Sequence, residues 1–225
     1  MKVVFDHING FGKVSEVDFI YSNPKGIPTE NTPVTYLEKG WVEWGDYWYN
    51  LRSVRLNVNE YTPSKTTKRL SNKIQTELVK LTKDNLSVIN SIYNKYVEYH
   101  NYVRDINISD FLGMDMLTYL YEGKIIGGLI YKIYKEEDKT AMASYQFLWD
   151  YKKPSLSLGK VSQLKEIEVA KYFDCKHLYL MGGYESVSSY KGDFKGFEWF
   201  TGGGWSDDTY IYKRLCERDD EKKIL

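Results

Sequence analysis

The stretch between residues 145 and 199 constrains the fold more than any other part of the sequence. It reads as a strand (YQFLWD, 145–150), a loop, a helix that opens at LSLG (156–159), a second strand (HLYLMGGY, 177–184) and an aromatic and basic turn (YKGDFKGFEW, 190–199). A strand that leads into a helix start places free backbone N–H groups beside its last side chain. Asp150, with Ser157 and Gly159 at the helix start, is therefore predicted to form a reaction centre.

Length, charge and cysteine content limit the class of protein. The 225 residues suffice for one large domain or two small ones, of which one compact unit with a sizeable core is expected. Because 31 basic residues balance 31 acidic ones, a nucleic-acid partner must meet a local basic patch. Cys175 and Cys216 lack CxxC spacing, which predicts neither a disulfide framework nor a cysteine-bound metal. No run approaches the roughly 20 apolar residues of a membrane helix, so we expect a cytoplasmic protein without a membrane partner.

Periodicity and turn residues predict three segments: a β-rich extension over residues 1–50 that opens with a hairpin, a domain over 51–218 and a frayed, charged tail over 219–225. The tryptophans of the extension, Trp41, Trp44 and Trp48, could form a stacking platform, but they are expected to pack under the long N-terminal loop. Within the domain we expect a strand (51–61), helices (64–81 and 84–104), a short helix (108–113), three antiparallel strands (116–150), a helix (157–173), a strand (177–182), a short helix (188–194) and two late strands (198–203 and 209–215).

This order of elements resembles the fold of the GCN5-related N-acetyltransferases, an α/β (α+β) fold with a mixed central sheet flanked by helices. The coenzyme A loop of those enzymes, Q/R-x-x-G-x-G/A, does not occur between residues 149 and 164. In its place stands WDYKKPSLSLG (149–159), which is similar to the aromatic-Asp-Pro loop and R-S-L-G of the arginyl- and leucyl-tRNA–protein transferases.

Further blocks resemble the same family, in the same order over roughly residues 36–199. These blocks are LRSVRLNVNEYTPSKTTKRL (51–70), YNKYVEYHNY (93–102), LKEIEVAKYFDCKHLYLMGGY (164–184) and SSYKGDFKGFEW (188–199). The chain departs from the family in three places: it has no cysteine in WGDYWYNLRS (44–53), Leu156 replaces the arginine before S-L-G, and Tyr99 replaces the arginine before His100.

The resemblance implies an enzyme that moves an amino acid, Arg or Leu, from tRNA to the N-terminal amine of an acceptor protein and so marks it for degradation. Charged tRNA and protein or peptide N-termini would be its partners, and the aminoacyl-tRNA would serve as co-substrate without a further cofactor or metal. Two alternatives stay open. One is an acyltransferase of the same fold that uses an acyl-CoA or another activated donor, and the other is a non-catalytic module that binds tRNA or a peptide terminus.

An aminoacyl ester is already activated, so few catalytic side chains are needed. Asp150 is expected to hold the ammonium of the amino acid or to polarise the attacking amine, and its alternative is a cap. Tyr145 would donate a hydrogen bond, unless it is a core residue. Backbone amides at Ser157 and Gly159 would face a phosphate or carbonyl oxygen, unless they serve only capping and packing.

The remaining candidates are expected to bind substrate. Tyr190 and Lys191, after the strand that ends at Tyr184, would steady the terminal ribose or phosphates, although each could equally be a surface residue. His100 is a further candidate, although a structural histidine is the commoner case. Five cations accompanied only by Glu60 favour a tRNA track over a solvated polar face: Arg52, Arg55, Lys65, Lys68 and Arg69.

Overall fold

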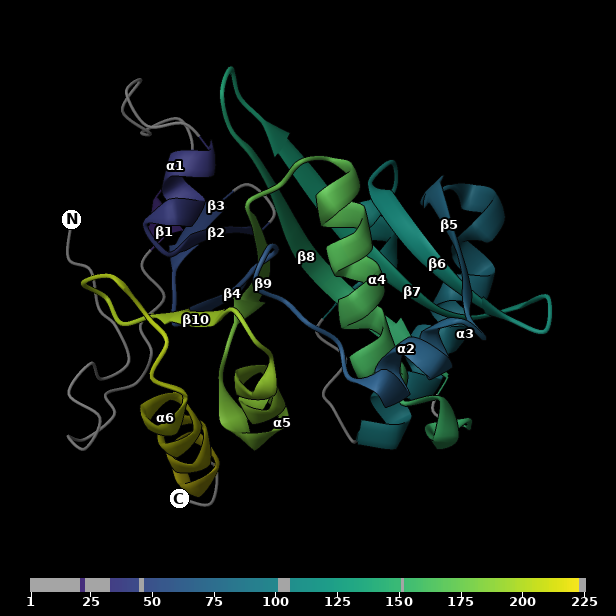
Figure 1. Cartoon of the computed structure of the whole chain (residues 1–225). Coiled ribbons are helices and arrows are strands. Elements are labelled where there is room, and N and C mark those ends of the chain that lie inside the picture. The colour runs from purple at the N-terminus through teal and green to yellow at the C-terminus, as the bar shows by residue number, and fades with distance from the viewer. Residues whose placement is uncertain (1–20, 23–32, 45–46, 101–105, 151, 223–225) are drawn as a thin grey trace. The chain divides into compact units, whose positions relative to one another are not determined.

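The computed structural model describes residues 21–22, 33–44, 47–100, 106–150 and 152–222 (Figure 1). The hairpin expected within residues 1–21 therefore lies outside the described residues, apart from its last position. The chain divides into two compact units. Unit 1 comprises Met1–Thr62, Tyr134–Ala141 and Phe173–Leu225, and unit 2 comprises Pro63–Ile133 and Met142–Tyr172.

Unit 1 contains a small antiparallel sheet that belongs to the predicted β-rich extension. Its order is β1 (Tyr21–Ser22), β3 (Tyr47–Asn50) and β2 (Trp41–Trp44). A helix that the sequence did not indicate, α1 (Pro33–Glu38), precedes β2. Trp41 and Trp48 are buried, and the Tyr36 ring lies 5.8 and 5.3 Å from theirs. These two tryptophans therefore serve packing, while the side chain of Trp44 lies outside the described part.

The larger sheet of unit 1 has the order β11-β10-β4-β9, and each neighbouring pair is antiparallel. These strands are β4 (Ser53–Asn57), β9 (His177–Gly182), β10 (Phe197–Phe200) and β11 (Trp205–Ser206). Two short helices, α5 (Glu185–Ser189) and η4 (Tyr190–Asp193), follow β9, where the sequence predicted one short helix over residues 188–194. The alternation of polar and apolar residues over 51–61 predicted strand β4, but it did not predict that β9 and β10 pair with this strand.

The last element corrects the sequence analysis. Residues 209–215 were expected as a strand and 219–225 as a frayed tail, but α6 (Thr209–Lys222) is one continuous helix. Asp208 caps it by accepting a hydrogen bond from the Ile211 N–H at 3.0 Å. Tyr212, Leu215 and Cys216 are buried, a spacing of three and four residues that indicates a helix and not a strand.

Unit 2 contributes strands in the order β8-β7-β6-β5, and β6 is antiparallel to both neighbours. They are β5 (Gln75–Lys80), β6 (Asp115–Tyr121), β7 (Lys124–Lys135) and β8 (Thr140–Trp149), of which β7 and β8 each have one end in unit 1. The predicted turn between β6 and β7 is confirmed, because Glu122 and Gly123 both have positive φ, 51° and 74°. Strand β5 was missed, since residues 64–81 were expected to be helical throughout.

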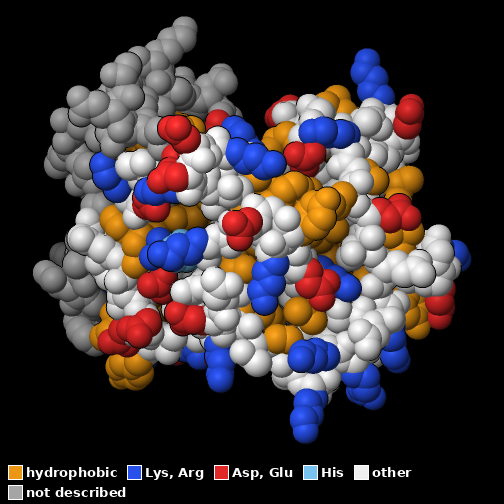
Figure 2. All heavy atoms as spheres, turned by 45° about the horizontal axis from the view of Figure 1, so that its top comes forward, with side chains coloured by type: hydrophobic (Ala, Val, Ile, Leu, Met, Phe, Trp, Pro, Cys, Tyr) orange, Lys and Arg blue, Asp and Glu red, His pale blue; other side chains and the backbone are white. Residues whose placement is uncertain are grey.

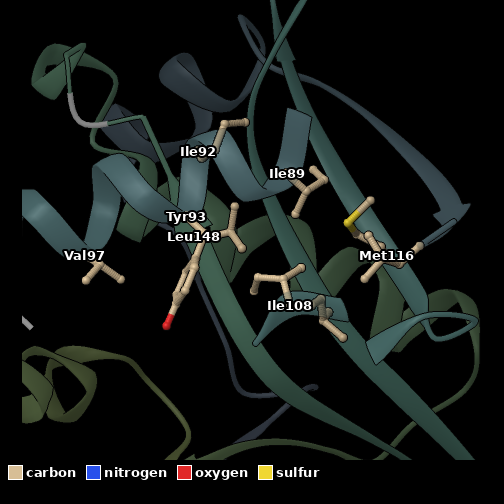
Figure 3. Packing of buried hydrophobic residues seen from close by; sticks show 9 residues of the cluster. Ile89, Ile92, Tyr93, Val97, Ile108, Met116 and Leu148 are labelled. Atoms are coloured by element: carbon tan, nitrogen blue, oxygen red, sulfur yellow. The ribbon is translucent and has the colours of Figure 1, made fainter. Parts of the chain in front are cut away.

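Helices α3 (Lys83–His100) and α4 (Leu158–Tyr172) confirm the two long helices predicted for this unit, and α2 (Lys65–Ser71), η2 (Ile108–Phe111) and η3 (Pro154–Leu156) are short. A hydrophobic cluster joins α3 to the strands. Figure 3 shows Ile89 of α3 facing Met116 of β6 and Tyr93 of α3 beside Leu148 of β8, and Ile92 belongs to the same cluster. The apolar spacing along α3 therefore matches a helix that buries one face.

The chain thus has the predicted mixed α/β fold with strands flanked by helices. A strand, helices, an antiparallel run β6-β7-β8, helix α4, strand β9, short helices and further strands follow one another, which is the order that the sequence predicted for this part of the chain. The same order places the end of β8 directly before the loop and the start of α4. This junction is where the sequence predicts a reaction centre.

Candidate active site at the end of strand β8

Asp150 lies at the end of β8, as the sequence predicted. Its backbone N–H donates to the Ile126 carbonyl at 2.7 Å, which continues the pairing of β8 with β7. Its Oδ1 accepts a hydrogen bond from the Lys152 N–H at 3.1 Å, so the carboxylate turns the chain out of the strand. The half-buried side chain therefore serves as a cap in this structure, and a second role in catalysis is a proposal.

Ser157 and Gly159 form the start of α4. Ser157 is exposed and adopts the left-handed conformation, φ 48° and ψ 47°, which is strained for a residue with a Cβ. Its carbonyl accepts the first helical hydrogen bonds, from the N–H groups of Lys160 and Val161 at 2.9 and 3.1 Å. A Cβ added at Gly159 would meet no atom within 4 Å. Close packing does not require a glycine there, and the space beside this turn is open.

The loop between β8 and α4 is tied to the turn between β6 and β7. The Lys153 ammonium lies 4.2 Å from the centre of the Tyr121 ring and 3.6 Å from the Glu122 carboxylate. Sequence analysis did not single out Lys153, although paired lysines after the strand are visible in the sequence. The contact fixes the loop on which Asp150 and Ser157 lie.

Tyr145 is partly buried and packs against the hydrophobic cluster of α3 and the strands. This environment is the one expected for a core tyrosine, so its role as a hydrogen-bond donor in catalysis has no support beyond its position on β8. His100 is the last residue of α3, and its side chain lies outside the described part of the structure. Its predicted role in substrate binding stays a prediction.

A buried polar cluster lies between α4 and the strands, and sequence analysis missed it. Glu166 is 1% exposed and accepts hydrogen bonds from the Ser144 hydroxyl at 2.7 Å and the Gln163 amide at 3.1 Å. Burial, and secondarily the Glu166 charge, raises the pKa of Tyr119 well above its usual value. Among the described residues, the Tyr119 hydroxyl and Gln163 Oε1 have no hydrogen-bond partner. Glu166 thus links α4 to β8 through Ser144, the residue that precedes Tyr145.

The predicted residues that follow β9 come together within unit 1. The Lys191 ammonium donates to the carbonyls of Leu180 and Gly182 at 3.2 and 3.4 Å. The ring of Tyr190 packs edge-on against Phe194, with ring centres 5.9 Å apart. Both side chains are half-buried and help to shape the turn, so they are more than surface residues.

The five predicted tRNA-binding cations separate into two groups. Arg52 is 1% exposed and forms an ion pair with Asp219 at 2.8 Å. Arg55 is 9% exposed, pairs with Glu198 at 2.7 Å and lies 4.0 Å from the Trp205 ring. Because their charges are buried and paired, these two arginines do not present a surface to RNA phosphates, which corrects the prediction for both.

The other three cations, Lys65, Lys68 and Arg69, are all exposed on α2. The opposite face of this helix buries Thr67, Leu70 and Ser71, and α2 contacts α4. On the face drawn in Figure 2, Lys and Arg side chains are scattered among Asp and Glu, so no single basic surface dominates it. The three exposed cations of α2 stay the predicted contact with tRNA in unit 2.

No three His, Cys, Asp or Glu side chains of the described residues are grouped as metal ligands. Cys175 and Cys216 are buried free thiols. Nor is any helix of the described chain both long and apolar enough to span a bilayer.

Comparison with known proteins identifies a distant relative. The chain is 26% identical over 209 residues to the aspartate/glutamate leucyltransferase of Campylobacter jejuni, a match that covers 80% of this chain and 82% of the relative. No family model matches the chain. The similarity therefore extends over most of both proteins, at low identity.

Solved structures give remote likenesses. L-PGS from Bacillus licheniformis is 10% identical with a TM-score of 0.48, over 65% of this chain and 48% of that one. A GCN5-related glucosamine N-acetyltransferase region of a fungal GH3 β-N-acetylglucosaminidase is 10% identical with a TM-score of 0.45, over 81% of this chain and 24% of that one. The chain thus spans half or less of these structures, and likenesses this remote carry no functional conclusion.

Proposed function

We propose that this distant relative of the aspartate/glutamate leucyltransferases is an aminoacyl-tRNA–protein transferase. It would move leucine or arginine from a charged tRNA to the N-terminal amine of an acceptor protein. The observation that carries the proposal is the similarity to the Campylobacter jejuni enzyme over 80% of the chain. Leucine, with acceptors that begin with Asp or Glu, is the first combination to test, because these are the residues in the name of the relative.

The proposed reaction needs little covalent chemistry from the protein. The neutral amine of the acceptor attacks the carbonyl carbon of the aminoacyl ester, and a C–N bond forms. The bond between that carbon and the ribose oxygen then breaks, and a proton passes from the attacking nitrogen to the leaving oxygen. The protein has to orient the two substrates and stabilise the negative charge on the carbonyl oxygen.

The end of β8 offers groups suited to these tasks. The Asp150 carboxylate has one oxygen engaged with the Lys152 amide, and we assign it to the ammonium of the donor amino acid or to the attacking amine. We assign the first amides of α4, beside the open space at Gly159, to the carbonyl oxygen or to a phosphate. Tyr145, which packs against the core, is the weakest of the catalytic candidates.

We assign tRNA binding to the exposed cations of α2, and we leave the buried Arg52 and Arg55 out of that surface. Tyr184, Tyr190 and Lys191 in unit 1 remain candidates for the terminal ribose and phosphates, as does His100. A cytoplasmic setting is expected, since aminoacyl-tRNA is made where proteins are synthesised.

The proposal is tested by incubating the purified protein with radiolabelled leucyl- or arginyl-tRNA and peptides that begin with Asp or Glu. An N-acetylated copy of each peptide, which lacks the attacking amine, is the control. Label should enter the free peptide and not the acetylated one. Turnover of acetyl-CoA without label transfer would favour an acyl-CoA acyltransferase instead, and tRNA or peptide binding without either reaction would indicate a non-catalytic module.

The role of Asp150 has its own test. Asp150→Asn should lower kcat by roughly 100-fold or more while the affinity for charged tRNA changes little. Asp207→Asn removes the same charge from an exposed position on the loop before α6 and should leave both quantities unchanged. Equal losses of kcat and tRNA affinity in Asp150→Asn would contradict the assigned role.

A further inference from the structure

The C-terminal helix α6 holds the segment that follows β9 through side chains on successive turns. In Figure 1, α6 lies beside α5, and the two helices are in contact. The bonds run from the Tyr212 hydroxyl to the Ser188 carbonyl (3.0 Å), from the Cys216 thiol to the Gly183 carbonyl (3.8 Å), and from the Glu185 and Ser186 N–H groups to the carboxylates of Asp219 (2.9 Å) and Asp220 (3.2 Å). Both backbone donors and backbone acceptors of the segment are thus satisfied by α6.

Arg52 connects this contact to strand β4. Its guanidinium donates to both carboxylate oxygens of Asp219, at 3.0 and 2.8 Å, and lies 4.6 Å from the centre of the Tyr184 ring. Its backbone N–H donates to the Tyr184 hydroxyl at 2.8 Å. The Asp219 carboxylate therefore accepts hydrogen bonds from both Arg52 and the Glu185 amide. Arg52 in turn contacts the Tyr184 ring through its guanidinium and the Tyr184 hydroxyl through its backbone N–H.

The backbone held in this way is strained. Met181 and Glu185 have φ values of 60° and 62°, a left-handed conformation that is strained for a residue with a side chain. A Cβ added to Gly183 would lie 2.5 Å from Val54 Cγ1 and 2.6 Å from the Tyr212 hydroxyl. The chain is therefore pressed against β4 and α6 and has little room for another path.

Hydrophobic burial does not explain why the segment keeps this conformation. None of the five residues of α5 is buried, and Val187 is 49% exposed. Strained conformations persist only where surrounding contacts determine them, and here those contacts are mainly the polar ones from α6 and Arg52.

We propose that Arg52 and Asp219 are positioning residues for the reaction. They fix the backbone of residues 181–191, and with it Tyr184, Tyr190 and Lys191, without touching substrate. The Lys191 ammonium is part of the same unit, because it binds the carbonyls of Leu180 and Gly182, on either side of the strained Met181. This inference rests on the proposed function, in which these three side chains contact the tRNA terminus.

The test compares Asp219→Asn with Glu221→Gln, which removes an exposed charge two residues later on the same helix. Amide hydrogen exchange of residues 184–189 should rise in Asp219→Asn, while exchange in the β-strands stays as in the wild type. Displacement of a positioned group by about 1 Å costs up to 100-fold in rate, so kcat should fall about tenfold or more. The Kd for charged tRNA should change less than kcat, and Glu221→Gln should match the wild type.

Two further variants keep the test decisive. Asp219→Glu retains the charge and should recover part of the kcat, which a general loss of stability would not predict. Asp220→Ala removes the carboxylate that accepts from the exposed Ser186 amide, and its smaller rise in exchange should accompany a smaller loss of kcat. It therefore supplies the comparison if Asp219→Asn unfolds.

The outcomes separate this inference from the function on which it rests. Wild-type kcat in Asp219→Asn, with faster exchange in residues 184–189, would overturn the positioning role and leave the proposed function standing. Unchanged exchange would overturn it as well, because α6 would then not hold the segment. A wild-type protein that transfers no amino acid would instead refute the proposed function.

Discussion

Replacing the three exposed cations of α2 with glutamine tests the contact with tRNA quantitatively. Lys65, Lys68 and Arg69 point away from the buried face of α2, and glutamine has a similar helix propensity. If each cation binds one phosphate, the three contribute about 2–3 units to the slope of log K against log salt concentration. Between about 50 and 200 mM salt, these contacts alone then account for a roughly 20- to 40-fold loss of affinity.

The assay measures the Kd for charged tRNA by filter binding at several salt concentrations, in the wild type and in the triple variant. The control variant replaces Lys83, Lys124 and Lys195 with glutamine, since these exposed lysines lie on α3, on β7 and in the turn before β10 and carry the same total charge. The α2 variant should lose about 2–3 units of slope, and the control much less. Equal slopes in the two variants would refute the assignment of the track to α2.

Four further predictions concern groups whose surroundings are well defined. Gly127→Ala should lower Tm by several degrees, because the new Cβ would lie 3.0 Å from a backbone oxygen of β8. Gly159→Ala should leave Tm unchanged but reduce transfer, and full activity in that variant would exclude a close approach of substrate there. Glu166→Ala should cost about 2–5 kcal/mol in urea unfolding, since it leaves a buried hydroxyl and amide without their acceptor. Burial and two nearby cations lower the pKa of His177 to about 3 in the folded protein. As the pH drops below about 6.5, this histidine therefore takes up a proton in the unfolded protein before it does so in the folded protein. The free energy of unfolding should thus fall between about pH 6.5 and pH 3. His177→Gln should flatten that dependence in urea titrations at stepped pH, and an unchanged slope would contradict the assignment.

Local patterns in the sequence predicted the elements that surround the end of β8. Three patterns each predict a single kind of structure: an apolar run before Asp150 predicts a strand, Glu122-Gly123 predicts a turn, and the apolar spacing of residues 84–104 predicts a helix. The structure confirms those elements. Burial was harder to predict. Arg55 alternates with Val54 and Leu56 as an exposed strand residue does, but partners more than 140 positions away bury and neutralise both arginines: Asp219 pairs with Arg52, and Glu198 pairs with Arg55.

The errors near the C-terminus have a related cause. Residues 209–215 are rich in tyrosine and isoleucine, which favour strands, and the acidic run after them resembles a solvated tail. The spacing of Tyr212, Cys216 and Asp219 is typical of a helix, but the aromatic residues of the same segment favour a strand, and the strand was predicted. Glu166 was also missed, because an isolated acidic residue on a helix gives no sign in the sequence that the opposite strand supplies a serine hydroxyl.

The central claim is that an ester carried by RNA, and not a thioester, is the donor for this fold. The most direct measurement presents both donors at once. The wild-type protein is incubated with leucyl-tRNA, acetyl-CoA and a peptide that begins with Glu, and the product is weighed by mass spectrometry. We predict a peptide heavier by one leucine residue, whereas an acetylated peptide as the product would contradict the account.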